Sequence, residues 1–159
     1  MPVSSADAEN TYYAQDEADL VTPSILRFGV RMRFVSGAAS TASRAPASFG
    51  FRLGPDRKKN AIYIRDGSIF LLTAENTAGP SVSIATSDQP HDYLIVADLT
   101  TGAIEARQDG VVVLTGATYP EPDPNAPPGI YFGEASLFGR GVSEWLGVEH
   151  NAHAPNNCP

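Results

Sequence analysis

Arginine side chains offer the clearest candidate chemistry in this sequence. Five of the nine arginines occupy the polar positions of segments in which apolar and polar residues alternate. Side chains of one phase in paired strands form a continuous surface, so we predict one sheet face lined with Arg, Tyr and Glu. A guanidinium binds carboxylates and sulfates through parallel hydrogen bonds. The candidate ligand-binding residues are Arg31, Arg33, Arg52, Tyr63, Arg65, Glu105, Arg107 and Tyr131.

Two other interpretations of this arginine face stay open at the level of sequence. The arginines and glutamates could form an ion-pair lattice that only solvates the sheet, or they could lie in a contact between subunits. If the five arginines share one face with few acids among them, they repel one another. An anionic ligand or an acidic partner surface would relieve that repulsion, and its binding would weaken as salt rises.

No catalytic motif is recognisable in the sequence. The paired carboxylates of glycoside hydrolysis, in the pattern Glu-x-Asp-x-x-Glu, are absent, and so is the Gly-x-Ser-x-Gly motif of serine hydrolases. Glu144 and Glu149 flank Trp145 at an odd spacing, which places them on opposite faces of a strand. We therefore predict no catalytic residues, and the sequence favours a protein that is not an enzyme.

The candidate metal ligands are few and poorly spaced. His150 and His153 are three residues apart but have no carboxylate beside them. Asp88, Asp92 and Asp98 lie close together in the chain, yet calcium requires six to eight oxygen ligands and no EF-hand loop is present. We expect no metal and no cofactor, with calcium as the weaker alternative.

Length and charge limit the classes of partner. The 159 residues suit one domain, and the net charge of −7 argues against nucleic acid or an anionic membrane as partner. Cys158 is the only cysteine, so no disulfide forms within the chain. Neither a secretory signal nor an apolar run of about 18 residues is visible, and the location stays open.

The periodicity of the chain predicts strands throughout. In residues 28–35 the apolar side chains alternate with polar ones, which is typical of a half-buried strand. Asp66-Gly67 and Asp109-Gly110 favour tight hairpins between neighbouring strands. Ten or so short strands without a helical pattern predict an all-β fold, an antiparallel β-sandwich of jelly-roll type. The predicted core residues are Phe28, Val30, Met32, Phe34, Phe51, Ile62, Ile64, Leu94, Val96, Val113 and Phe132.

The chain divides into three predicted parts. Residues 1–24 carry five acids and no Lys or Arg among the first twenty residues, and we interpret them as an acidic lead-in that is partly ordered. Residues 25–150 form the sandwich. Residues 151–159 are a polar tail that we expect to fray.

Several segments resemble a known family. Residues 91–98, then 101–105, then Asp109-Gly110 resemble the central hairpins of concanavalin A-like, laminin-G-type jelly rolls of the lectin–glucanase superfamily. Residues 130–136 and 143–148 are similar to the closing strands of these domains. The resemblance implies two antiparallel sheets, one of them concave, and an extracellular or virion location. It does not imply one activity, because the superfamily includes lectins, adhesion modules, virion parts and glycoside hydrolases.

Three functional hypotheses follow. The first is a non-catalytic, lectin-like binding module that holds a carbohydrate, including an acidic one, or a protein partner on its concave sheet. The second is a structural or assembly protein, such as a virion decoration or fibre subunit. The third is a glycan-active enzyme whose acids come from strands without a recognisable motif. None of the three requires nucleic acid or a membrane, and each allows self-association.

Overall fold

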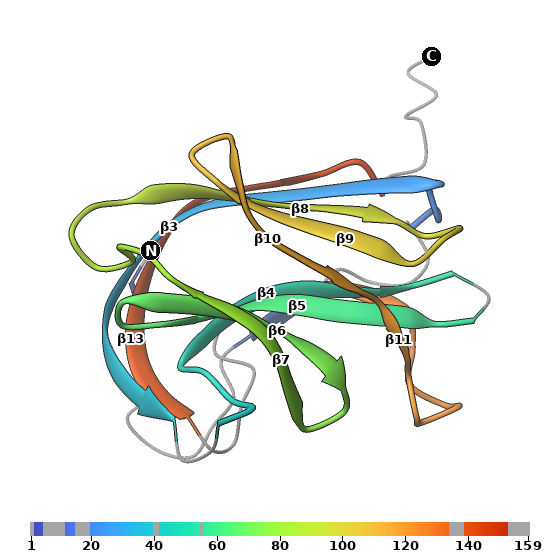
Figure 1. Ribbon diagram of the computed structural model, residues 1–159, viewed down its shortest axis with the longest axis horizontal. Helices are drawn as coiled ribbons and strands as arrows, with labels where there is room; N and C mark the ends of the chain where they lie inside the picture. Colours follow the sequence, from blue (N-terminus) through green and yellow to red (C-terminus); the bar gives the residue numbers. More distant parts are fainter. Residues whose placement is uncertain are drawn as a thin grey trace.

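The chain folds as a sandwich of two antiparallel sheets, which confirms the predicted all-β class (Figure 1). The computed structural model describes residues 2–4, 12–14, 20–39, 42–54, 56–133 and 139–152. Every regular element in these ranges is a strand. The part of the chain that the structure describes has no helix that could cross a membrane.

The first sheet, called sheet A, contains six strands. In spatial order they are β1 (Pro2–Ser4), β13 (Gly139–His150), β3 (Ile25–Ala39), β8 (His91–Asp98), β9 (Ala103–Gln108) and β10 (Val111–Ala117). The turn between β9 and β10 has positive φ at both Asp109 (51°) and Gly110 (82°), as a two-residue hairpin of type I′ requires. The prediction of a hairpin at Asp109-Gly110 is confirmed.

The second sheet, called sheet B, contains seven strands. In spatial order, six of them are β2 (Tyr12–Ala14), β12 (Gly129–Gly133), β4 (Ala47–Leu53), β5 (Lys58–Arg65), β6 (Ser68–Ala74) and β7 (Thr77–Ser83). The seventh, β11 (Tyr119–Pro120), lies outside this order and pairs with β5. Asp66 and Gly67 connect β5 to β6 in the predicted hairpin.

The main core lies between the two sheets and follows from the alternation within each strand. Phe28 of β3 and Phe49 of β4 are fully buried, and their rings meet edge to face with centroids 5.2 Å apart. The predicted core residues of β3, β4 and β5 are buried. Val113 and Phe132 are partly buried and pack against this core.

Leu94 and Val96 are partly buried, but they do not belong to the core between the sheets. In the register between β3 and β8, Tyr93 lies opposite Val30 and Ile95 lies opposite Phe28. Tyr93 and Ile95 therefore point inward and are buried, while Leu94 and Val96 lie on the outer face of sheet A. A strand that is apolar at every position does not reveal from its own sequence which phase is buried.

Sheet B is buried on both faces near its centre. On its outer face the residues Ala45, Ala61, Tyr63, Phe70, Leu72 and Tyr119 form a second buried cluster, and Tyr131 packs against it. Gly50 of β4 lies opposite Ala61 of β5, and a Cβ atom at Gly50 would collide with Ala61. This close approach gives the middle of the outer face a flat floor.

The outer face of sheet B is the concave face of the sandwich. Figure 1 shows the far ends of β3 and β13 curving past one end of sheet B, and the chain that follows β11 extending past the other end. Pro46 lies close to Gly141 of β13, so the first of these borders is in contact with the chain entering β4. A ligand on this face would lie between the two borders.

A histidine held by two carboxylates joins two loops at the edge of the sandwich. His91 Nδ1 lies 2.7 Å from an Asp109 carboxylate oxygen, and His91 Nε2 lies 2.9 Å from one of Asp88. Burial alone would lower the pKa of His91, but the hydrogen bonds and charges of Asp88 and Asp109 raise it above its usual value. The hydrogen bond from His91 lowers the pKa of Asp88.

We predict that replacing Phe49 with Ala lowers the free energy of unfolding by about 3–5 kcal/mol, through lost burial and the cavity left behind. Leu146→Ala is the control, because the Leu146 side chain is exposed, and it should change this free energy by about 0.5 kcal/mol or less. Urea unfolding followed by far-UV circular dichroism measures both. Equal effects of the two substitutions would contradict the assigned core.

We predict that His91 stabilises the fold most at mildly acidic pH. A histidine whose folded pKa is raised contributes its full stability below the unfolded pKa of about 6.5, and the contribution is lost as the pH rises through the folded pKa. The wild type should therefore have a higher melting temperature than His91→Gln. This difference should be largest just below pH 6.5 and should decrease as the pH rises further. A difference that does not change between pH 5.5 and pH 9 would contradict this role.

Candidate functional site

The eight predicted site residues are divided between the two sheets. Four lie on the outer face of sheet A, namely Arg31, Arg33, Glu105 and Arg107, and four lie on that of sheet B, namely Arg52, Tyr63, Arg65 and Tyr131. The prediction that all five arginines share one face is therefore wrong. Alternation fixes the phase of a residue within its strand, but it does not say to which sheet the strand belongs.

The arginines of sheet A are each paired with an acid. The pairs are Arg31–Asp92 at 2.9 Å, Arg33–Glu144 at 3.0 Å and Arg107–Glu105 at 2.6 Å. These side chains are largely exposed, and such pairs contribute only about 0–1 kcal/mol each. The ion-pair lattice describes this face, and the mutual repulsion predicted for the arginines does not arise here.

A shallow groove of about 440 Å³ crosses the outer face of sheet A. Gly29 of β3 and Gly147 of β13 form part of its floor, and Arg31 with Asp92 line it. The arginine in this groove is already paired with its direct neighbour Asp92, and the carboxylate Glu149 also lines the groove.

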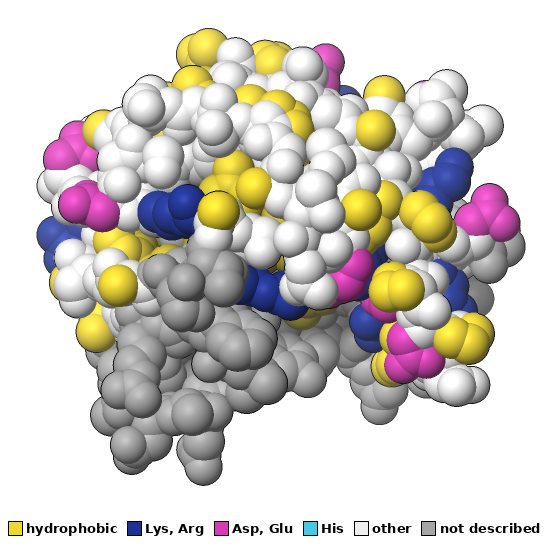
Figure 2. Space-filling view, turned by 60° about the horizontal axis from the view of Figure 1, so that its bottom comes forward, with side chains coloured by type: hydrophobic (Ala, Val, Ile, Leu, Met, Phe, Trp, Pro, Cys, Tyr) yellow, Lys and Arg dark blue, Asp and Glu magenta, His cyan; other side chains and the backbone are white. Residues whose placement is uncertain are grey.

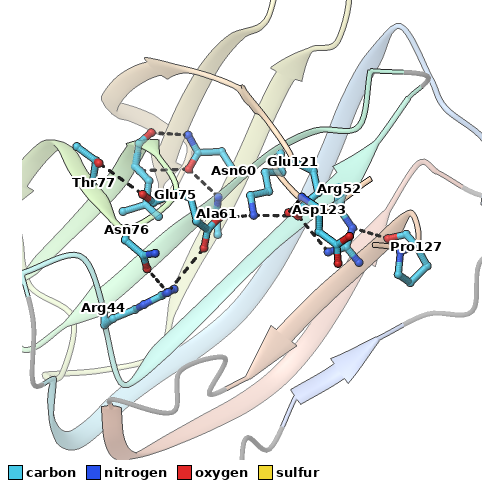
Figure 3. Close-up of polar contacts among 12 residues, drawn as sticks. Arg44, Arg52, Asn60, Ala61, Glu75, Asn76, Thr77, Glu121, Asp123 and Pro127 are labelled. Atoms are coloured by element: carbon cyan, nitrogen blue, oxygen red, sulfur yellow. Dashed lines mark hydrogen bonds and ion pairs between the residues drawn. The ribbon is translucent and has the colours of Figure 1, made fainter. Parts of the chain in front are cut away.

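The outer face of sheet B carries a connected polar network. Its members come from strands and from the loops that flank them: Arg44, Arg52, Lys59, Glu75, Asn76 and Glu121. We call this set the outer-face network. Figure 3 shows the contacts among these side chains, and Figure 2 shows basic side chains across this side of the molecule with acidic ones among them.

Lys59 lies at the centre of the network. Its Nζ donates a hydrogen bond to Glu121 Oε2 at 2.9 Å and also pairs with Glu75 Oε2. Arg52 Nη1 lies 3.3 Å from the same Glu121 oxygen, and Arg44 Nη2 lies 3.7 Å from Glu75 Oε1. Cations and carboxylates thus alternate, and three cations with two carboxylates leave one positive charge.

Burial strengthens these contacts. The side chain of Lys59 is 12% exposed and that of Glu121 is 6% exposed, whereas Glu75 is 35% exposed. Burial alone would raise the pKa of Glu121, but the hydrogen bonds from Lys59, the Asp123 amide and Arg52, with the charge of Lys59, lower it below its usual value. Glu121 is therefore ionised at neutral pH.

Asn60 explains why β5 presents Lys59 at this position. The Asn60 side chain bridges strands of both sheets, since Nδ2 donates to the carbonyls of Leu72 and Ala117, each at 2.9 Å. Its Oδ1 accepts hydrogen bonds from the amides of Ala61 and Leu72. Asn60 thereby replaces the backbone pairing between the first part of β5 and β6 and fixes the strand next to Lys59.

Three tyrosines lie beside the charged groups. Tyr63 stacks on Phe70 with ring centroids 5.0 Å apart, and Lys59 Nζ lies 5.4 Å from the centroid of the Tyr119 ring. Burial raises the pKa of Tyr63 to about 12 and raises those of Tyr119 and Tyr131 as well. All three are neutral phenols at physiological pH. Tyr63 and Tyr119 are buried, and Tyr131 is partly exposed.

Arg65 has a supporting position in this arrangement. Its Nε and Nη2 donate hydrogen bonds to the carbonyl of Arg44, and its guanidinium lies 4.2 Å from the Phe70 ring centroid. Burial lowers the pKa of Arg65. These contacts fix the backbone at Arg44, whose side chain belongs to the outer-face network.

Sequence reasoning missed Arg44, Lys59, Glu75 and Glu121. Lys59 was detectable, because it lies four residues before Tyr63 and alternation places both side chains on the same face of a strand. However, the sequence of residues 57–60 is typical of a solvated turn, so the strand was expected to begin after them. β5 in fact begins at Lys58. Glu75 lies in the β6–β7 turn and Glu121 in the loop after β11, where no periodicity places a side chain.

The structure separates the aspartates considered as calcium ligands. Asp88 contacts His91, Asp92 pairs with Arg31, and Asp98 accepts hydrogen bonds from the amides of Thr100 and Thr101. Among the described residues, no group of three or more His, Cys, Asp or Glu side chains is arranged to hold a metal ion. His153 and Cys158 lie outside the described residues.

Comparisons with known proteins give matches in structure alone. Neither a protein-family model nor a curated protein matches the sequence. Sheep galectin-11 in complex with glycerol matches with a TM-score of 0.53 and 8% identity over 87% of this chain and 96% of that one. The carbohydrate recognition domain of Emp46p matches with a TM-score of 0.54 and 12% identity over 92% and 80%.

An enzyme also shares this architecture. The alginate lyase AlyA1 from Zobellia galactanivorans matches with a TM-score of 0.50 and 11% identity over 94% of this chain and 72% of that one. At such identities the likeness concerns the fold and leaves the activity open. The resemblance detected in the sequence is confirmed at this level: the chain has the concanavalin A-like jelly-roll fold.

Proposed function

We propose that this protein binds a carbohydrate on the outer face of sheet B. The observation that carries the proposal is the outer-face network, in which three cations and two carboxylates alternate beside a tyrosine floor on the concave sheet. Ligand sites combine an apolar floor with a few convergent polar groups, and this face has both.

The network has the groups that sugar recognition requires. Sugar hydroxyls both donate and accept hydrogen bonds, so carboxylates such as Glu75 and cations such as Arg52 complement them. Arg52, Glu75 and Tyr131 are each partly exposed and can meet a ligand. The same face could hold an acidic glycan, because its cations outnumber its carboxylates.

The likeness to known structures supports the same class of ligand. One of the similar structures is a carbohydrate recognition domain and another is a galectin.

The hypothesis of an assembly protein stays a prediction, since its distinguishing feature is a stable oligomer. Ultracentrifugation of the purified protein would reveal such an oligomer.

A glycan-active enzyme is the second candidate, and one contact favours it. Glu75 and Glu121 both pair with the Lys59 ammonium, so two carboxylates face each other on the concave sheet. Glycosidases act through two carboxyl groups about 5–9.5 Å apart, one of which must carry a proton. The lowered pKa of Glu121 suits a nucleophile or base. The second carboxyl group of such a pair, the acid, would be that of Glu75.

We predict that catalysis, if the protein has it, depends on Glu75. Replacing Glu75 with Gln removes the acid while keeping its shape, and a glycosidase would lose at least about a hundredfold in rate. Release of reducing ends from a polysaccharide panel measures this. If the wild type releases none from any polysaccharide that it binds, the binding module stands and the enzyme is refuted.

We predict that Arg52→Gln weakens glycan binding by at least about tenfold. The substitution removes a charged donor, and a charge-assisted hydrogen bond contributes about 1.5–3 kcal/mol, where 1.4 kcal/mol is a tenfold change. Arg107→Gln on sheet A is the matched control and should bind as the wild type does. A glycan array followed by calorimetry at low salt gives the affinities.

Either of two results would contradict this site. The wild type could bind no neutral or acidic glycan at low salt, which would refute carbohydrate binding altogether. Alternatively, Arg107→Gln could weaken binding as much as Arg52→Gln, which would move the site away from sheet B. Melting temperatures of both variants show whether either one has lost its fold.

A further inference from the structure

We propose that Glu121 is an internal ligand of the outer-face network. Its carboxylate occupies the position between Arg52 and Lys59 that a carboxylate of an acidic glycan, such as a uronic acid unit, would take, and the ligand displaces it on binding. This inference rests on the proposed function, because it specifies the ligand class of that same site and adds a competitor built into the chain.

The register of sheet B creates the need for an anion at this place. Arg52 of β4 and Lys59 of β5 lie directly opposite each other and belong to the same face of the sheet. Like charges opposite each other on paired strands repel and destabilise the sheet. One Glu121 oxygen lies 3.3 Å from Arg52 Nη1 and 2.9 Å from Lys59 Nζ, so it relieves this repulsion.

The position is built for a carboxylate. Glu121 Oε2 contacts the two cations, while Oε1 accepts a hydrogen bond of 3.1 Å from the Asp123 amide. The Glu121 side chain is 6% exposed, and an ion that is this well buried must be paired and hydrogen-bonded. A carboxylate carried by a sugar ring would find the same two cations.

Glu121 does not belong to the sheet whose cations it neutralises. It begins a segment of residues 121–128 that we call the strap, which joins β11 to β12 and contains Pro122, Pro124, Pro127 and Pro128. β11, which precedes the strap, has two residues, and among the described strands it pairs with β5 alone. Proline restricts the backbone, so the strap presents Glu121 at little cost in conformational entropy.

The strap is held mainly by arginine side chains. Arg57 Nη1 donates to the carbonyls of Ala126, at 2.7 Å, and of Pro124. Arg52 Nε donates to the carbonyl of Pro127, as Figure 3 shows. One backbone hydrogen bond adds to them, from the Glu121 amide to the Arg57 carbonyl at 3.1 Å. Movement of the Glu121 side chain therefore leaves the hydrogen-bond ladder of sheet B intact.

An internal competitor lowers the affinity for the ligand that it imitates. The apparent dissociation constant equals the intrinsic one divided by the fraction of molecules in which the site is free. A neutral sugar does not compete for the two cations, so its affinity should not depend on the charge of Glu121. An acidic glycan competes with it, and removal of that charge should increase its affinity.

The experiment compares three proteins with two matched sets of glycans. The proteins are the wild type, Glu121→Gln and the control Asp123→Asn, which removes one charge from the same strap. The Asp123 carboxylate accepts a hydrogen bond from the Asn125 amide. The probes are linear tetramers of galacturonate, glucuronate and mannuronate, and the neutral tetramers of galactose, glucose and mannose. Calorimetry at low salt measures each affinity.

We expect Glu121→Gln to bind at least one uronate tetramer about tenfold more tightly than the wild type does. Its affinity for neutral tetramers should stay within about twofold, and Asp123→Asn should behave as the wild type. In the wild type, saturation with that uronate should also shift the Asp123 amide resonance, because this amide donates to Glu121. Neutral tetramers should leave the resonance in place.

The outcomes separate this inference from the function on which it rests. Unchanged or weaker uronate binding by Glu121→Gln, or an Asp123 resonance that stays in place at saturation, overturns the internal ligand. Binding of neutral tetramers alone also overturns it and leaves the proposed function standing. If no protein binds any tetramer, both are refuted. The resonance is measured on the wild type, so the test holds even if Glu121→Gln fails to fold.

Discussion

The burial of the Lys59 ammonium is the constraint on which the outer face of sheet B depends. Asn60 fixes β5 at this point, and the aromatic cluster beside Lys59 covers the sheet, so the Lys59 side chain is only 12% exposed. A charge removed from water to this extent costs several kcal/mol unless it is paired. Glu75 and Glu121 supply the pairing, and they in turn bring Arg44 and Arg52 into one network.

The same burial determines what chemistry this face can do. Tyr63, Tyr119 and Tyr131 have raised pKa values because they are buried, so they are neutral at physiological pH. Glu121 has a lowered pKa because its partners outweigh its burial. The face is therefore a fixed arrangement of full charges and neutral phenols, which suits recognition of a polar ligand.

Local patterns in the sequence predicted the strands but not their partners. The alternation in residues 28–35 identified β3 and its buried side, and Asp109-Gly110 identified a hairpin, because both depend on neighbouring residues alone. The division of the arginines between two sheets depends on strand order, which alternation does not contain. Glu121 meets Lys59 across 62 residues of chain, through a loop whose path no periodicity describes.

The two outer faces differ in where their counter-ions come from, and this difference argues for the location of the site. On sheet A the acids are strand residues: Asp92 lies directly opposite Arg31, and Glu144 directly opposite Arg33. The backbone of such an acid is fixed by the hydrogen-bond ladder, so only its side chain can move. On sheet B the acids Glu75 and Glu121 come from a turn and a loop. These two carboxylates can move together with the backbone that carries them while the strands keep their pairing, which favours this face for the proposed exchange with a ligand.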